Sequence, residues 1–248
     1  MNQKPARAPR FYVDERLRPG ASCVLAEDSA HHAVHVLRLR AGEDVVLFDG
    51  RGGEYPARIA AIERLRIAVD VLEHRSIERE TALHVVLVQG VSSGERMDYT
   101  IRKAVELGVA EIRPVLAAAS LARPRGERAA ARQAHWHKVV IAACEQCGRN
   151  RLPPVRALIA AAEYREEDPD SLRILLSPAA ELAFSRALES PGSRYVLAAG
   201  PEAGFNAAEE RTFLDAGFVP ARLGPRVLRT ETAALAALAA LNALRGDF

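Results

Sequence analysis

Two cysteines and two histidines in the middle of the chain have spacings that could suit a metal ion or a redox reaction. Cys144 and Cys147 are separated by two residues, and His135 and His137 precede them. Residues 127–147 are predicted to be helical, so His137 and Cys144 lie about 10 Å apart along the helix axis, too far to share one zinc ion. A redox pair would begin at a helix N-terminus, whereas this pair lies at a C-terminus. The pattern therefore favours a structural role over metal or redox chemistry.

A second group of histidines, His31, His32 and His35, also has the residue type of a metal site. No carboxylate or cysteine stands beside them at ligand spacing, and the glutamate of an HExxH motif is missing. We therefore expect these histidines to pack within the fold or to contact RNA, and we predict no metal for the protein.

Two charged side chains near the C-terminus, Arg229 and Glu231, stand between a tight turn and a long apolar segment. Gly224-Pro225 cannot continue a strand or helix, Thr230 is a good N-cap, and Glu231 suits the positive end of the helix dipole. Residues 232–244 carry no charge, and this run of 13 residues is well short of the length needed to cross a bilayer. The pattern predicts a loop and helix that place both charges at a site beside a dimer interface. The alternative is a capped core helix with two incidental charges.

The composition is that of an ordinary globular chain, with 49% hydrophobic and 27% charged residues. Three cysteines do not make a disulfide framework, and residues 1–10 lack the apolar core of a secretory signal. We therefore expect a cytoplasmic protein that does not associate with membranes.

Arginine dominates the basic residues, because lysine occurs only at positions 4, 103 and 138 among 34 basic side chains. Residues 123–151 carry seven basic side chains against two acidic ones. Arginine suits bidentate phosphate contacts and base stacking, so this pattern favours a nucleic-acid partner. A GC-rich genome would explain the same excess of arginine, and the composition leaves both explanations open.

The chain is predicted to form two domains. Residues 1–74 show short β-rich runs around one short helix, which indicates a small barrel-like module of a kind that often presents a basic rim to RNA. Residues 75–80 are polar and predict a linker. From residue 75 to residue 248 apolar strands alternate with helices, so we expect an α/β domain with a parallel sheet.

Three predicted strands of the second domain end in stiff loops that contain glycine or proline. The loops begin at Ser177-Pro178, at Gly200-Pro201 and at Gly224-Pro225. In open α/β sheets, ligands bind at the carboxyl ends of the strands. The chain lacks GxGxxG and GxxxxGK[ST] motifs, so an ordinary dinucleotide or P-loop site is not expected. These features predict a cofactor site lined mainly by backbone.

The same loops carry a family resemblance. The motif at residues 200–204 (Gly-Pro-Glu-x-Gly) and the motif at residues 223–232 (Leu-Gly-x-Arg-Val-Leu-Arg-x-Glu-Thr) resemble the SPOUT methyltransferase superfamily. The match is best to its RsmE family, which methylates N3 of a uridine in 16S ribosomal RNA of the small subunit. Residues 103–108, 142–149, 10–11, 31–32 and 36–38 match that family in the same order. The resemblance thus spans nearly the whole chain.

The resemblance implies a PUA-like RNA-binding domain at 1–74 and a SPOUT methyltransferase domain at 75–248 with a trefoil knot. It also implies S-adenosyl-L-methionine as cofactor, a homodimer, and 16S ribosomal RNA or the small ribosomal subunit as partner. By position, the cofactor-binding residues would be Leu176, Ser177, Pro178, Gly200, Pro201, Glu202, Gly204, Leu223, Gly224, Val227 and Leu228.

The roles of the charged residues follow from the reaction that the resemblance implies. Arg229 would stabilise charge on a uracil carbonyl oxygen as the N3 proton leaves. Glu231 would be the base, or else a partner of the helix dipole. Glu202 would face the sulfonium of the cofactor or cap its own loop. The alternatives to this function are a ribosome-assembly factor that binds RNA without catalysis, and a SPOUT methyltransferase that acts on another RNA.

Two further expectations concern RNA contact and cofactor affinity. Arg10, Arg38, Arg149 and Arg151 are expected to bind RNA phosphates. Where the family has Gly-Pro-Glu-Gly-Gly, this chain has Ala203 at the fourth position. A left-handed backbone there would cost about 1–2 kcal/mol with alanine and would weaken cofactor binding.

Overall fold

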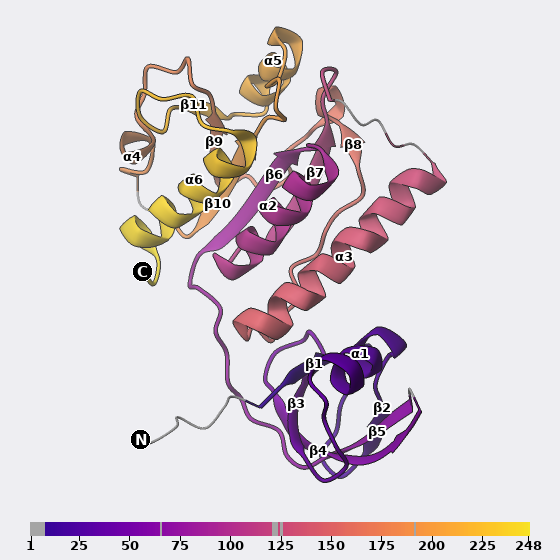
Figure 1. Ribbon diagram of the computed structural model, residues 1–248. Helices are drawn as coiled ribbons and strands as arrows, with labels where there is room; N and C mark the ends of the chain where they lie inside the picture. The colour runs from indigo at the N-terminus through magenta and orange to yellow at the C-terminus, as the bar shows by residue number, and fades with distance from the viewer. Residues whose placement is uncertain (1–7, 65, 121–123, 125, 191) are drawn as a thin grey trace. The chain divides into compact units, whose positions relative to one another are not determined.

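The computed structural model describes residues 8–64, 66–120, 124, 126–190 and 192–248 (Figure 1). The chain divides into two compact units. The first comprises Met1–Glu80 with Cys144–Leu152, and the second comprises Thr81–Ala143 with Pro153–Phe248. The first unit thus also contains residues 75–80 and 144–152, which the sequence placed beyond the first domain. The domain limits of 1–74 and 75–248 remain a prediction.

The first unit is built on a curled five-stranded sheet in the order β1-β3-β4-β5-β2, in which β1 runs parallel to β3 and the other pairs are antiparallel. Alternate residues of β5, such as Ile67, Val69 and Val71, point into its core, as expected of strands with one buried face. A short helical segment packs on this sheet, as predicted, although half of it is π-helix. The elements are β1 (Arg10–Tyr12), β2 (Ser22–Val24), α1 (Glu27–His31), η1 (His32–Val36), β3 (Asp44–Phe48), β4 (Tyr55–Glu63) and β5 (Arg66–Val71).

A buried ion pair stabilises the first unit. Arg10 Nη1 donates to Glu54 Oε2 at 2.7 Å, and the two side chains are only 4% and 8% exposed. Arg79 donates to the same carboxylate at 2.9 Å, and Arg10 Nη2 also reaches Asn150 Oδ1 at 2.5 Å. Burial acts to raise the pKa of Glu54, but the hydrogen bonds from Arg79 and Arg10 outweigh it and hold the pKa below its usual value.

The second unit contains a six-stranded, fully parallel sheet in the order β11-β9-β10-β6-β7-β8, which confirms the predicted α/β architecture. On one face Val86, Val88 and Val196 pack in a cluster with Phe213 of α5. On the other face α2 and α6 lie side by side, and α6 contacts β10 (Figure 1). The strands are β6 (His84–Gly90), β7 (Glu111–Leu116), β8 (Ile159–Ala160), β9 (Leu172–Leu176), β10 (Arg194–Ala199) and β11 (Val219–Ala221).

One helix of the second unit, α5, follows its local sequence signal. α5 begins with a capping box in which the Asn206 side chain and Glu209 satisfy each other's backbone N–H groups. α3 begins in the second unit, and its last turn belongs to the first. The helices are α2 (Gly94–Glu106), α3 (Glu127–Cys147), η2 (Ala161–Glu163), α4 (Phe184–Ala187), α5 (Ala207–Asp215) and α6 (Thr230–Arg245).

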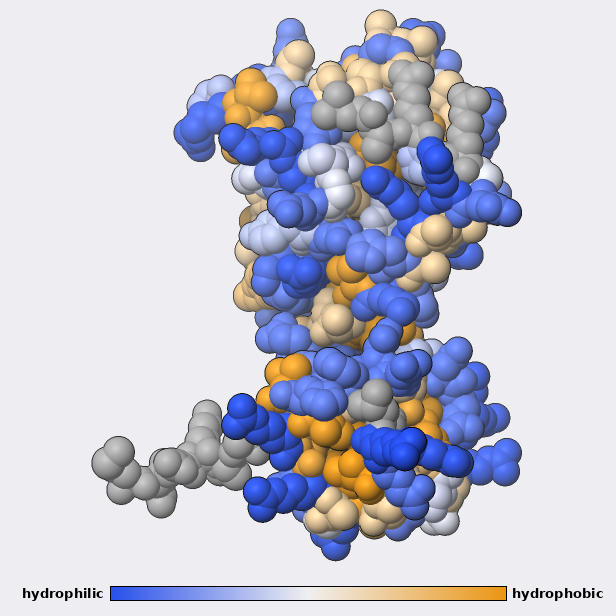
Figure 2. Space-filling view, turned by 45° about the vertical axis from the view of Figure 1, so that its right-hand side comes forward, coloured by the Kyte–Doolittle hydropathy of each residue, from blue (hydrophilic) through white to orange (hydrophobic). Residues whose placement is uncertain are grey.

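The described helices include none with the length and apolar character to span a bilayer. The surface visible in Figure 2 is largely hydrophilic, with apolar residues interspersed. Apolar side chains exposed in the first unit include Val36 and Leu37, at the end of the π-helix.

The buried ion pair generates a stability prediction. We expect Glu54→Gln to lower the free energy of local unfolding of β3–β5 by about 3 kcal/mol, because the buried guanidinium of Arg10 loses its carboxylate partner. Because the pKa of Glu54 is lowered in the folded state, its contribution is complete above the unfolded pKa and is lost as the pH falls through the folded pKa. As the pH is lowered, the free energy of unfolding of the variant should therefore fall less than that of the wild type.

Native-state hydrogen exchange of the amides in β3–β5 measures the effect. The matched control is Asp44→Asn, which removes an exposed ion pair with Arg58 in the same sheet and should cost about 0.5 kcal/mol or less. Equal losses in the two variants would show that the buried pair contributes no more than a surface pair.

Candidate functional site

The strand order of the second unit creates a switch point between β6 and β10. These two strands are neighbours in the sheet, but β7 and β8 lie on one side of them and β9 and β11 on the other. Loops that follow the two neighbours therefore leave the sheet in opposite directions and open a crevice at the carboxyl ends, which is where open α/β sheets bind ligands.

A cavity of about 410 Å³ lies at this end of the sheet. It brings together all three predicted loops, although they are far apart in the sequence. Its lining includes nine of the predicted cofactor residues, whereas Leu223 and Gly224 lie outside it. The nine are Leu176, Ser177, Pro178, Gly200, Pro201, Glu202, Gly204, Val227 and Leu228.

The end of β6 approaches the loop after β10 so closely that position 90 must be glycine. A Cβ at Gly90 would lie 2.4 Å from the backbone nitrogen of Pro201 and 2.8 Å from the carbonyl carbon of Gly200. The loop itself is tightly turned, because Gly204 N donates to Pro201 O at 2.9 Å and Gly204 has a φ of 75°. The backbones of β6 and of this loop thus lie in contact beside the cavity that the loop lines.

Ala203 does not occupy the strained position that the sequence raised as a concern. Among the described residues other than glycine, a positive φ occurs at Arg38 and Arg64 and not at Ala203. The left-handed position of the loop is taken by Gly204. The backbone penalty considered for Ala203 therefore does not arise in this structure.

A buried polar chain ties the loop after β10 to the start of α6. Gln89 is fully buried, and its Nε2 donates to Thr230 Oγ1 at 2.9 Å. The Thr230 hydroxyl in turn donates to the carbonyl oxygen of Gly200 at 2.5 Å. Gln89 was missed from the sequence, where its signal is one amide in an apolar strand just before a glycine.

The prediction that Thr230 is the N-cap of α6 is wrong. Arg229 occupies the N-cap position, with extended backbone angles and no side-chain cap. The Thr230 hydroxyl is instead used by Gln89 and Gly200. A tertiary contact has thus taken the side chain that the local sequence assigned to a cap.

Glu202 contacts the start of α2. Its Oε1 accepts from the backbone N–H of Ser93 at 3.0 Å and from Arg96 Nη1 at 3.2 Å. Burial acts to raise the pKa of Glu202, but the hydrogen bond from Ser93 and that from Arg96 outweigh it and lower the pKa. The structure therefore gives this carboxylate a hydrogen-bonding role between the loop and α2. Arg96, which also lines the cavity, was not found from the sequence.

The two predicted catalytic residues are two positions apart at the start of α6 and differ in exposure. Arg229 is exposed and lines the cavity. Glu231 is in the first turn of α6 and outside the lining, and its Oε2 is shielded from solvent. Within the described part of the chain this oxygen accepts no hydrogen bond. Glu231 thus retains an unused acceptor close to the cavity.

The four arginines predicted to bind RNA phosphates fall into two pairs. Arg10 and Arg149 are 7% and 5% exposed, and they bind Glu54 and Glu80 within the first unit. Arg38 is exposed, and Arg151 is exposed beside Glu78 at 3.4 Å. The first pair therefore has internal partners in place of the accessible position that the prediction assumed. The phosphate contacts of all four remain a prediction.

Cys144 is buried, and two of the histidines stack on each other. Burial raises the pKa of Cys144 to about 12, so its thiol is poorly suited to redox chemistry. The rings of His31 and His35 pack with their centroids 4.5 Å apart. In the described ranges, no three His, Cys, Asp or Glu residues are grouped so that they could hold a metal ion.

Both parts of the chain match known protein families. Residues 79–242 match the model of the RNA methyltransferase domain family, and residues 25–72 match the RNA methyltransferase PUA domain. The chain belongs to this RNA methyltransferase family, and its two-part architecture is that of SPOUT methyltransferases with a PUA-like domain.

Individual relatives are named ribosomal RNA small subunit methyltransferase E. Those from Buchnera aphidicola and Mycobacterium tuberculosis are 30% and 34% identical, and the alignments cover 99% and 94% of this chain and 97% and 91% of the relatives. The Neisseria gonorrhoeae enzyme of that name was solved with S-adenosyl methionine, at 39% identity and a TM-score of 0.89 over 98% of this chain and 100% of the other. A Legionella pneumophila protein solved with the same cofactor is 35% identical, with a TM-score of 0.92 and the same coverage.

The close approach at Gly90 generates a prediction. We expect Gly90→Ala to lower the free energy of unfolding by about 2 kcal/mol, because the new methyl group meets backbone atoms that cannot move independently. The control is Gly94→Ala, where a Cβ would have no heavy atom within 4 Å. Urea titration followed through the fluorescence of Trp136, which lies in the same unit, measures both. Equal effects in the two variants would contradict the packing argument.

Proposed function

We propose that this chain transfers the methyl group of S-adenosyl-L-methionine to N3 of a uridine in 16S ribosomal RNA of the small ribosomal subunit. The main support is the single cavity formed by the three predicted loops in a chain whose relative, at 39% identity, was solved with this cofactor. The names of the other relatives support ribosomal RNA as the substrate. The choice of N3 rests on the family resemblance.

The residues of the cavity suit the cofactor. A volume of about 410 Å³ is within the usual range for a small-molecule site. Residues 176–178, 200–204 and 227–229 would hold the cofactor, largely through backbone groups that the tight turn at Gly204 leaves accessible. When bound, it would supply an electrophilic methyl group carried by a sulfonium.

The proposal includes a trefoil knot in the second domain, as the resemblance implies. The hydrogen bond from Ser177 N to Ala221 O and that from Thr230 to Gly200 support it, because they hold the last segment against both earlier loops. An experimental backbone trace in which residues 223–229 pass outside those loops would exclude the knot.

The chain's own residues would act on the base. N3 of uracil lies on the Watson–Crick edge, so the nucleotide must be unpaired or flipped out of a helix. The guanidinium of Arg229 would stabilise negative charge on a uracil carbonyl oxygen. Oε2 of Glu231, which accepts no hydrogen bond from the described residues, would accept the N3 proton. If Glu231 serves only the helix dipole, Glu231→Gln will leave the pH profile of turnover unchanged.

A homodimer is the assembly that the exposed face of α6 supports. In the single chain Leu235 and Ala239 are half-buried, and Leu244 is 54% exposed. Leu235 and Ala239 are four residues apart and so share one face of α6, where a second copy would cover them. A monomer mass by light scattering would exclude this assembly.

The function is tested by incubating the protein with labelled S-adenosyl-L-methionine and small ribosomal subunits from cells that lack the activity. We expect N3-methyluridine among the nucleosides when the RNA is digested and analysed by mass spectrometry. A methyl group on another atom or in another RNA would instead identify a related methyltransferase. Failure to bind the cofactor, with RNA binding intact, would support the assembly-factor alternative.

We predict that Arg229→Ala lowers kcat by about 100-fold or more and changes the cofactor Kd by less than about threefold. The reason is that Arg229 is exposed at the cavity and would act on charge that develops during the reaction. Single-turnover rates and calorimetry separate the two quantities. Arg211→Ala, at an exposed position on α5, is the control for loss of charge. A rise in Kd as large as the fall in kcat would exclude a catalytic role.

A further inference from the structure

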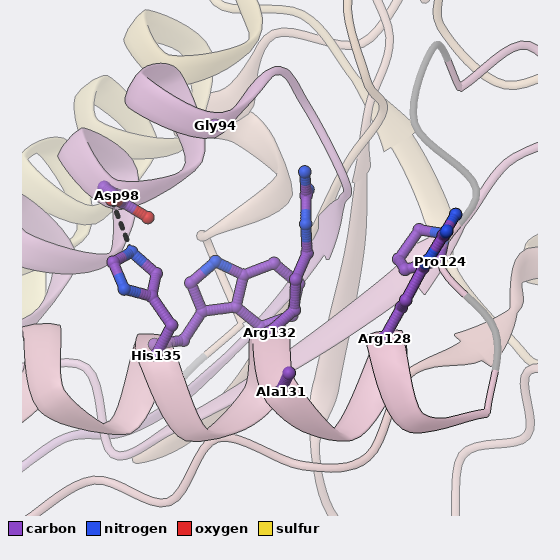
Figure 3. Close-up of a pocket in the computed structure, with 8 residues that line it drawn as sticks. Gly94, Asp98, Pro124, Arg128, Ala131, Arg132 and His135 are labelled. Carbon is purple, nitrogen blue, oxygen red and sulfur yellow. Dashed lines mark hydrogen bonds and ion pairs between the residues drawn. The ribbon is translucent and has the colours of Figure 1, made fainter.

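A second cavity, of about 590 Å³, lies between the start of α2 and the first half of α3 (Figure 3). Trp136, which is 2% exposed, forms part of its wall, and Gly94 marks the end of α2 that opens onto it. The proposed reaction assigns this cavity no role. Its volume is large enough for one nucleotide unit.

Two arginines and a histidine of α3 line this cavity. Arg128, Arg132 and His135 are four and three residues apart, so they lie on one face of the helix. Figure 3 shows both side chains rising from α3, with Arg128 beside Pro124 and Arg132 nearer to α2. Because both side chains line the same cavity, one extended anionic ligand can contact both.

Arg132 carries a donor that none of the described residues satisfies. Its Nη1 is shielded from solvent, and within the described residues it has no hydrogen-bond partner. A shielded guanidinium N–H without an acceptor is unfavourable, and an anionic oxygen is the acceptor that suits it best. This atom therefore points to an anionic ligand rather than to an apolar one.

The acidic group in the lining is already engaged. Asp98 Oδ2 is 2.7 Å from His135 Nε2 (Figure 3). Glu95 and Glu127, in the first turns of α2 and α3, are exposed and are not among the lining residues. Among the described lining residues, the two arginines thus meet one carboxylate, which is held by a histidine. The α2 N-terminus, whose N-cap Ser93 makes no side-chain cap, adds its positive dipole end.

The first turn of α2 is shared with the cavity proposed to bind the cofactor. Gly94 and Asp98 line the cavity beside α3, whereas Arg96 lines the cofactor cavity. Glu202 of the cofactor loop binds both Ser93 and Arg96. A ligand in the second cavity would therefore lie one helix turn from the loop that is proposed to carry the methyl donor.

We propose that the cavity between α2 and α3 binds the phosphate of a nucleotide that neighbours the target base in the RNA substrate. Arg128 and Arg132 bind the phosphate oxygens, and the wall formed by Trp136 accommodates the attached sugar. This inference rests on the proposed function for the identity of the ligand, since a polynucleotide can occupy both cavities at once.

The test uses the full-length protein and a fluorescently labelled, single-stranded RNA that contains uridine. We expect Arg132→Gln and Arg128→Gln each to raise the Kd for this RNA about tenfold and to reduce the slope of log Kd against log salt by about 0.7. Arg211→Gln removes an exposed arginine of the same unit outside both cavities and should leave both quantities near their wild-type values. Affinity for S-adenosyl-L-methionine should be unchanged in all three variants.

The proposal is overturned if both cavity variants bind the RNA as Arg211→Gln does. It is also overturned if they lose cofactor affinity in proportion to RNA affinity, which would show a structural effect. Arg128 is exposed, so its variant decides the matter if Arg132→Gln fails to fold. Because RNA binding is measured without turnover, arginine-dependent binding supports the site even if the wild type transfers no methyl group, a result that would refute only the proposed function.

Discussion

The second unit depends on the close approach of β6 to the loop that follows β10. Only a residue without a side chain can end β6 at Gly90, because Pro201 occupies the space that a Cβ would need. The register of the two strands pairs Gln89 with Ala199 and thereby brings the amide of Gln89 to Thr230. This one contact between backbones thus fixes the positions of the loop after β10, the start of α6 and the wall of the cavity. The first unit is stabilised differently, by a buried ion pair as well as an apolar core.

Much of the fold could be predicted from the sequence because its signals are local. Apolar runs such as residues 83–88 indicate strands buried on both faces, and Gly/Pro pairs mark the loops at their ends. Family motifs supplied the loops that meet at the cavity, and nine of the eleven expected cofactor residues line it. Strand order could not be obtained in this way, since no local pattern states that β10 lies between β9 and β6.

The interactions that could not be predicted from the sequence have a common cause: their partner residues are distant in the sequence. Arg10 resembled an exposed basic residue, but its partners Glu54 and Asn150 lie 44 and 140 residues away. Thr230 has the sequence signal of a cap, but Gly200 and Gln89 take its hydroxyl. Arg96 has no signal in the sequence that marks it, because its partner Glu202 lies 106 residues away. A side chain with several available partners is assigned by the tertiary fold, and single-sequence reasoning does not contain that information.

The contact of Glu202 with the first turn of α2 has a thermodynamic consequence. That turn forms part of two cavities, so its position enters the binding free energy of any ligand in either one. If one ligand tightens the turn, the affinity of the other changes, and linkage requires the effect to be equal in both directions. Each substrate would then change the affinity for the other by the same factor. The carboxylate of Glu202 would then carry the coupling between the two binding sites.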